Sequence, residues 1–162
     1  MQKLKLIGLA ILSGLLMGVS WPATGGLAPL FFIALIPLLY VEYTVSQNQN
    51  KMGGGFLYLC AFLCFLTFNF YTTWWIYFAS PEGMAMAVIL NSLFMGIVFL
   101  WFYKIKKLFG KRKGYLSLIF FWISFEWIHY HWEFSHPWSS YGNVFANMPE
   151  LVQWYEYTGV LG

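Results

Sequence analysis

Long apolar runs separated by short polar segments constrain this sequence more than any other feature. They recur from the N-terminus to about residue 132, and about 20 apolar residues in a helix are enough to cross the hydrocarbon core of a bilayer. Of all residues, 60% are hydrophobic and 9% are charged, whereas soluble domains typically carry about 25% charged residues. The sequence therefore predicts an all-α polytopic membrane helix bundle, with about five transmembrane helices plus a short interfacial helix.

Two regions divide the chain. Residues 1–132 are predicted to form the transmembrane bundle. Its spans are expected at about 4–21, 30–45, 56–78, 84–103 and 114–132. Pro37 lies inside the second span and is expected to kink it, because proline removes a backbone hydrogen bond. Residues 133–162 are predicted to form an outer-face loop and a short interfacial helix leading to a missing sixth span.

The interfacial helix is expected to begin near Asn147. This residue is followed three positions later by Glu150, an arrangement that resembles an N-cap and its capping partner. A helix starting there would place Leu151, Trp154 and Tyr155 on one face. Such an apolar face is typical of a helix that lies on a membrane surface.

The basic residues predict the orientation of the bundle. They fall at the N-terminus and in the second and fourth predicted loops: Lys3, Lys5, Lys51, Lys104, Lys106, Lys107, Lys111, Arg112 and Lys113. Alternation puts these segments on one face, and the positive-inside rule makes that face cytoplasmic. We expect a cytoplasmic N-terminus and an outer location for residues after about 132. No nucleic-acid partner is predicted, because the run at 104–113 is a short loop between spans.

A few polar or reactive side chains lie in or near the first three spans. Glu42 is near the inner end of the second span, where its carboxylate is expected to reach water or headgroups. Cys60 and Cys64 fall inside one apolar run. We interpret both as buried small hydrophobic residues, because no base or electropositive group that would activate a thiol is visible nearby.

Residues 125–142 concentrate the chemically active side chains of the protein, including all its histidines. Glu126 is the one carboxylate well inside a span, so it should face the bundle or a water-filled cavity and have a partner. His129 follows three positions later on the same helix face. The favoured interpretation is a structural pair that pins the end of the helix. The alternative is a pair that handles protons or binds a lipid headgroup.

The histidines also raise the question of a metal. His129 and His131 point to different sides of a helix. No cysteine or suitably spaced carboxylate lies near these two residues or near His136 to complete a ligand set. Zinc is therefore not predicted. Haem held by two histidines would usually need ligands from different helices, so haem is not predicted either. We expect no metal and no cofactor.

The segment from His136 to Gly142 predicts a fixed turn at headgroup level. Pro137 restricts its backbone, Gly142 permits an unusual backbone angle, and Trp138 and Tyr141 supply aromatic rings. Such a surface is suited to gripping an acyl chain or seating another domain. An ordinary belt of interfacial aromatic residues is the alternative.

An ordered set of short segments extends over essentially the whole chain. They are Ser13-Gly-Leu-Leu-Met-Gly-Val-Ser-Trp-Pro22, Leu35-Ile-Pro-Leu-Leu39, Gly55 leading to Trp74-Trp75-Ile76, Glu126-Trp127, Pro137-Trp138-x-x-x-Gly142, and Leu151-Val-Gln153 leading to Gly159-Val-Leu-Gly162. With this set the sequence resembles the bacterial apolipoprotein N-acyltransferases. It departs from them at His129, where the family usually has arginine, and at His136, where it usually has phenylalanine.

The resemblance implies an activity. Such enzymes have about eight membrane helices and a nitrilase-like domain outside the bacterial cytoplasmic (inner) membrane. They transfer an acyl chain from a phospholipid to the N-terminal diacylglyceryl-cysteine of a lipoprotein, through a thioester on a catalytic cysteine assisted by glutamate and lysine. Cys60 and Cys64 do not match that cysteine, so no catalytic residue is assigned. The resemblance implies phospholipid and lipoprotein partners, and a periplasmic side for residues after about 132.

We therefore hypothesise that the chain is the membrane part of such an enzyme and is inactive alone. The candidates for facing lipid substrate or seating the catalytic domain are Glu126, Trp127, His129, Pro137, Trp138, Tyr141 and Gly142. One alternative is a small membrane transporter or channel that uses Glu126 and Asn91 as a polar path. Another is a purely structural membrane subunit.

Overall fold

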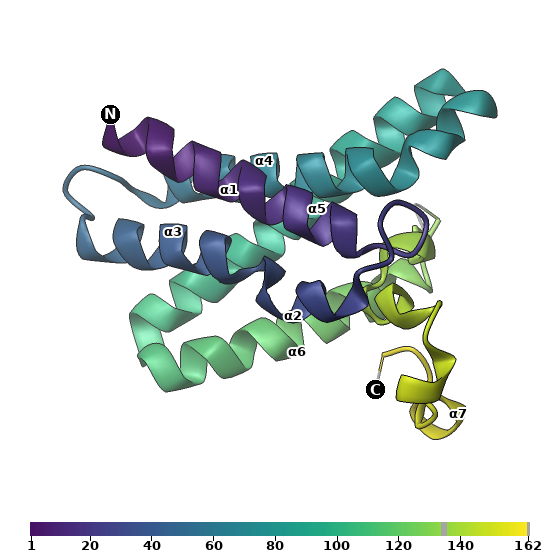
Figure 1. The fold of residues 1–162 in the computed structure, drawn as a ribbon. Coiled ribbons are helices and arrows are strands. Elements are labelled where there is room, and N and C mark those ends of the chain that lie inside the picture. The colour runs from purple at the N-terminus through teal and green to yellow at the C-terminus, as the bar shows by residue number, and fades with distance from the viewer. Residues whose placement is uncertain (134–135, 162) are drawn as a thin grey trace.

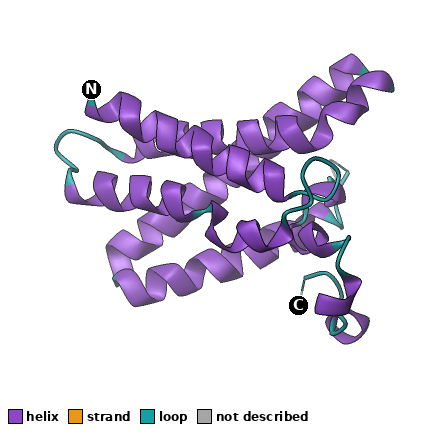
Figure 2. Cartoon of the chain, in the orientation of Figure 1, coloured by secondary structure: helices purple, strands orange, loops and turns teal. Residues whose placement is uncertain are grey.

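A computed structural model describes residues 1–133 and 136–161, and within these ranges the secondary structure is helical, with no strand (Figures 1 and 2). The elements up to the end of the bundle are α1 (Gln2–Ser20), η1 (Ala28–Leu30), α2 (Phe31–Ala34), α3 (Ile36–Gln47), α4 (Gly54–Thr73), η2 (Trp74–Phe78), α5 (Pro81–Phe109) and α6 (Lys111–His129). Short 3₁₀ turns and one short helix follow: η3 (Pro137–Ser139), η4 (Tyr141–Phe145), η5 (Pro149–Leu151) and α7 (Tyr155–Thr158). Residues 134–135 of the predicted outer loop, and Gly162 of the last matching segment, lie outside the described residues.

The predicted helical membrane bundle is confirmed. Four helical stretches of the described chain are long and apolar enough to cross a membrane: Gln2–Ser20, Ala28–Gln47, Gly54–Phe78 and Pro81–Phe109. The helix α6 overlaps the predicted fifth span, but it begins with three basic residues. The division of the chain into five spans and an outer segment stays a prediction.

The second stretch is broken where the sequence predicts a kink. The helix α2 ends at Ala34 and α3 begins at Ile36, with Pro37 in its first turn. Proline has no backbone N–H and its ring clashes with the carbonyl four residues earlier, so it kinks or breaks an α-helix. Regular bonding resumes when the Leu39 N–H donates to the Leu35 carbonyl at 2.9 Å.

The predicted basic loop at 104–113 is wrong. The helix α5 continues to Phe109, and α6 begins at Lys111 after a single-residue turn at Gly110. Gly110 has a φ of +86°, a conformation that glycine adopts without steric penalty. Lysines in the last turn of α5 also favour the extension, because cations there interact well with the helix dipole.

The helix α4 packs against both α1 and α5, α6 packs against α5, and α3 packs against α1 (Figure 1). At Gly14 the backbones of α1 and α4 come so close that a Cβ atom would lie 2.2 Å from the Cys64 carbonyl oxygen. A small residue is required there. In bilayers, such close approach of small residues is a principal source of helix association.

A buried ion pair fixes the end of the bundle that carries the basic residues. Glu42 of α3 is fully buried, and its carboxylate accepts a hydrogen bond from Lys106 of α5 and another from the Ser46 hydroxyl at 2.6 Å. The Lys106 ammonium also lies 4.9 Å from the centre of the Tyr115 ring of α6. The expectation that Glu42 reaches water or headgroups is therefore wrong, because the extension of α5 brings Lys106 over it.

The C-terminal segment differs from the predicted capped helix. The residue before η5 is Met148, and the Asn147 side chain instead donates a hydrogen bond to the Pro22 carbonyl at 3.3 Å. The helix α7 is only four residues long. A contact with the loop after α1 therefore replaces the predicted N-cap.

Replacing Lys106 with methionine is expected to destabilise the protein by about 3 kcal/mol or more, because it leaves the Glu42 carboxylate buried without its counter-ion. The double variant Glu42→Leu/Lys106→Met removes both charges, so its loss of stability is expected to be much smaller. Unfolding titrations of both variants in detergent micelles measure the difference. Equal losses in the two variants would contradict a buried ion pair at this position.

Candidate functional site

The carboxylate of Glu126 lies near the end of α6, opposite the basic end of the bundle. One oxygen, Oε1, accepts a hydrogen bond from the Trp122 indole N–H at 3.1 Å and another from the backbone N–H of Tyr141 at 2.7 Å. Glu126 is 7% exposed. A carboxylate in such surroundings is stable only when it has hydrogen-bond donors. Here the donors join the end of α6 to the turn that begins at Pro137.

The ring of Tyr141 is inserted into the bundle beside this carboxylate. It stacks on Trp122 with a centroid distance of 4.5 Å and an angle of 24°, and it meets the edges of Phe31 and Phe68 at 4.8 and 6.2 Å. Burial raises the pKa of the Tyr141 phenol well above its ordinary value. Aromatic contacts to α2, α4 and α6 therefore hold this turn to the bundle.

Gly142 is required here for a different reason from the one predicted. Its φ is not positive, since the glycines with positive φ in the described chain are Gly26, Gly110 and Gly159. A Cβ atom at Gly142 would instead lie 2.2 Å from the Val160 carbonyl oxygen. The Tyr155 hydroxyl also donates a hydrogen bond to the Gly142 carbonyl at 3.3 Å. The C-terminal segment therefore lies so close to the backbone at Gly142 that only glycine fits there.

The predicted pair of Glu126 and His129 is not formed. His129 is 4% exposed, and within the described part of the chain neither of its ring nitrogens has a hydrogen-bond partner. Its ring packs on Phe125 and Phe94, at centroid distances of 4.4 and 6.4 Å. Glu126 does pin the end of the helix, but it acts through Trp122 and the Tyr141 backbone.

The three histidines lie in different environments. His136 is buried, like His129, and burial lowers its pKa below the ordinary value. His131 is exposed, stacks on Trp127 at 4.3 Å, and its Nδ1 lies 2.7 Å from the Trp127 carbonyl oxygen. The described residues hold no group of three or more His, Cys, Asp or Glu side chains suited to a metal ion.

The remaining candidates lie on the outside of this end. Trp127 and Trp138 are 54% and 57% exposed. Trp138 meets the edge of Trp75 at 6.2 Å, which joins the turn to η2, and Pro137 begins the turn at η3. The structure therefore gathers Glu126, Tyr141 and Gly142 into one arrangement, with His129 beside it, and leaves Trp127 apart.

A buried polar network that sequence reasoning did not assemble lies beneath the turn. Asn91 of α5 donates to Asn69 of α4 at 2.8 Å, and Asn69 donates to the Ser92 hydroxyl at 3.0 Å. The Ser139 hydroxyl of the turn donates to the same Asn69 oxygen at 3.4 Å. The sequence shows Asn69 and the neighbouring pair Asn91 and Ser92 as polar residues within spans. Their pairing depends on the register of α4 against α5.

Comparison with known proteins decides the family. Residues 13–162 match the family described as the apolipoprotein N-acyltransferase N-terminal domain. The chain belongs to this family. It is similar to the apolipoprotein N-acyltransferase of Chlorobaculum tepidum, with 37% identity over 157 residues, which cover 95% of this chain and 28% of that protein. The chain thus spans less than a third of the length of that relative. No solved structure matches it.

Within this N-terminal domain, Glu126→Ala is expected to release the turn at 137–146 from the bundle. The substitution removes an acceptor of two hydrogen bonds, and we expect a loss of stability of about 2 kcal/mol or more. Limited proteolysis in nanodiscs, read by mass spectrometry, measures cleavage after residue 136. The control is Glu82→Ala, which truncates an exposed carboxylate at the start of α5. Equal cleavage of the two variants would show that Glu126 does not hold the turn.

Proposed function

We propose that this chain forms the membrane part of an apolipoprotein N-acyltransferase, which transfers an acyl chain from a phospholipid to the N-terminal diacylglyceryl-cysteine of lipoproteins. The observation that carries the proposal is the family match over residues 13–162, supported by the relative at 37% identity. The membrane location follows from the apolar helices of the bundle. The family name describes acyl transfer to an apolipoprotein. The phospholipid donor and the diacylglyceryl-cysteine acceptor are what the family resemblance implies.

The two cysteines support a catalytic nucleophile outside these residues. Cys60 and Cys64 are fully buried in α4, and the Cys64 carbonyl lies against the backbone of α1 at Gly14. A thiol in such a place cannot reach a lipid ester or carry an acyl group to an acceptor. We propose that the thioester forms on a cysteine of a nitrilase-like domain in the full-length enzyme, and that residues 1–162 alone are inactive.

We further propose that the end of the bundle with Glu126 seats that domain and faces the periplasm. The basic residues near the N-terminus, at the end of α5 and at the start of α6 lie at the opposite end of the bundle, which is cytoplasmic by the positive-inside rule. Exposed aromatic rings surround the Glu126 end, including Trp75, Trp138 and Trp154. Such rings are suited to the interface, where one side of each is apolar and the other meets water.

The proposal is tested in the full-length enzyme with a lipopeptide acceptor and a phospholipid donor. We expect Trp138→Ala to lower kcat/KM by about 10-fold, as loss of a positioning contact does, and Trp138→Phe to retain most of the activity. The exposed Tyr157→Ala is the control for loss of an aromatic ring at the same end. Acyl transfer by Trp138→Ala at the rate of the unaltered enzyme would contradict a role for this turn.

The same assay tests the position of the nucleophile. The double variant Cys60→Ala/Cys64→Ala is expected to form the acyl-enzyme at the normal rate, because neither thiol carries the acyl group. Mass spectrometry of the trapped intermediate locates the thioester. An acyl group on either cysteine, or flux of solutes through vesicles containing only residues 1–162, would favour a different function.

A further inference from the structure

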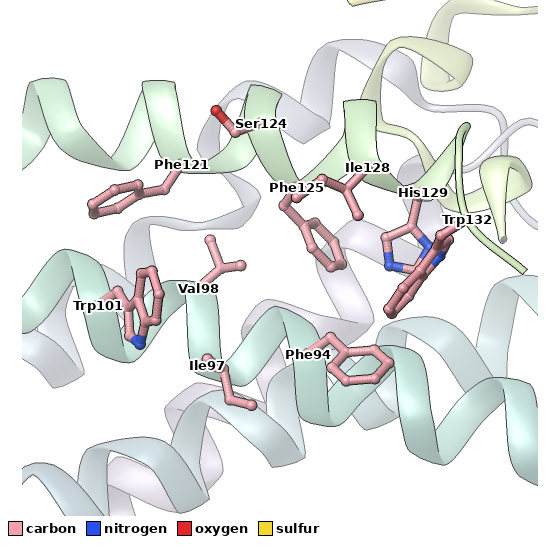
Figure 3. Close-up of a pocket in the computed structure, with 10 residues that line it drawn as sticks. All are labelled: Phe94, Ile97, Val98, Trp101, Phe121, Ser124, Phe125, Ile128, His129 and Trp132. Carbon is pink, nitrogen blue, oxygen red and sulfur yellow. The ribbon is translucent and has the colours of Figure 1, made fainter. Parts of the chain in front are cut away.

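An apolar groove runs between α5 and α6 on the outside of the bundle. Its volume is about 270 Å³. Figure 3 shows side chains of both helices lining it, among them Phe94, Ile97 and Trp101 of α5 and Phe121, Phe125 and Ile128 of α6. Ile97, Trp101 and Ile128 are exposed. The groove therefore opens sideways, toward the region that lipid chains occupy around a membrane bundle.

His129 closes one end of this groove and also lines a second, more polar cavity. That cavity has a volume of about 160 Å³ and is shared with Asn91, Glu133 and His136. Phe94 lines both spaces, so the apolar groove and the polar cavity adjoin along Phe94 and His129. Together they form one site with an apolar part and a polar part.

The polar part contains hydrogen-bonding atoms that the described chain does not satisfy. Both ring nitrogens of His129 and Nε2 of His136 are buried without a partner, and the two residues are 4% and 8% exposed. A neutral imidazole offers one N–H donor and one acceptor nitrogen. Leaving such groups unsatisfied is costly in an apolar environment, so a ligand with polar oxygens beside an apolar chain fits both parts of the site.

The depth of the site in a bilayer agrees with a lipid. The helix α6 runs from Lys111 to His129, a length of about 28 Å at 1.5 Å per residue. The hydrocarbon core of a bilayer is roughly 30 Å thick. With the basic start of α6 at one interface, His129 lies near the other, at the level of ester and phosphate groups. The groove then lies at the level of the acyl chains.

We propose that this combined site binds one glycerophospholipid of the bilayer. Part of one acyl chain lies in the groove between α5 and α6, and ester or phosphate oxygens accept hydrogen bonds from His129 and His136. A protein helix that packs an apolar face on the groove would leave the imidazole nitrogens without these acceptors. The site rests on the predicted crossing of the membrane by α6 and does not depend on acyl transfer.

Photo-crosslinking of the full chain in nanodiscs tests the proposal. The nanodiscs contain phosphatidylcholine with a small fraction bearing a diazirine in one acyl chain, and adducts are mapped by peptide mass spectrometry. We expect adducts concentrated on residues 94–101 and 121–128. Val98→Trp, which fills the groove, is expected to reduce them at least 5-fold. His129→Phe and His136→Phe each remove a hydrogen bond and are expected to reduce them by about 3- to 10-fold.

Two matched controls separate the site from general contact with lipid. Ile119→Trp places the same side chain on an exposed face of α6 outside the groove, and His131→Phe replaces an exposed histidine. Both are expected to leave the adducts unchanged, and unfolding temperatures confirm that every variant is folded. Adducts spread evenly over exposed helix faces, or unaffected by Val98→Trp and the buried-histidine variants, would overturn the proposal. A lack of adducts on both residues 94–101 and residues 121–128 would also overturn the proposal, because it would show that protein covers the groove.

Discussion

The organisation of one end of this bundle depends on the carboxylate of Glu126. A carboxyl group inside the last two turns of an apolar helix needs hydrogen-bond donors. One oxygen of Glu126 accepts hydrogen bonds from the Trp122 side chain and from the Tyr141 backbone N–H. The second bond folds the chain back onto the bundle. It brings the Tyr141 ring against Trp122 and places Gly142 against the C-terminal segment. The exposed Trp138 and the buried His136 owe their positions to the same turn.

A second polar contact organises the opposite end. Lys106 pairs with Glu42 and lies over the ring of Tyr115, so that α3, α5 and α6 meet at one buried charge pair. Apolar contacts alone distinguish poorly between helix arrangements in lipid, because the lipid chains are as apolar as the helices. The ion pair and the Asn69–Asn91 contact specify which faces of the helices meet. The Glu126 bonds then fix the turn against the bundle.

The sequence predicts most of the fold because apolar runs and proline act locally. The helical stretches and the break before Pro37 follow from these signals. Contacts between distant residues were harder to predict. Glu42 was expected at the membrane surface, because nothing local shows that α5 continues far enough for Lys106 to cover it. Glu126 was correctly expected to need a partner, but the partner is partly a backbone N–H fifteen residues away. The spacing on one helix face favoured His129 as the partner of Glu126. In the folded chain the His129 ring packs on Phe125 and Phe94 instead.

In the function proposed here, lipids and a catalytic domain engage the turn at 137–146, which must therefore stay fixed. Glu126 holds this turn to the bundle. Amide hydrogen exchange in nanodiscs measures this most directly. We expect the Tyr141 amide to exchange as slowly as the core amides of α4, because it donates a hydrogen bond to a buried carboxylate. Exchange as fast as that of exposed loop amides, such as those of residues 48–51, would contradict it.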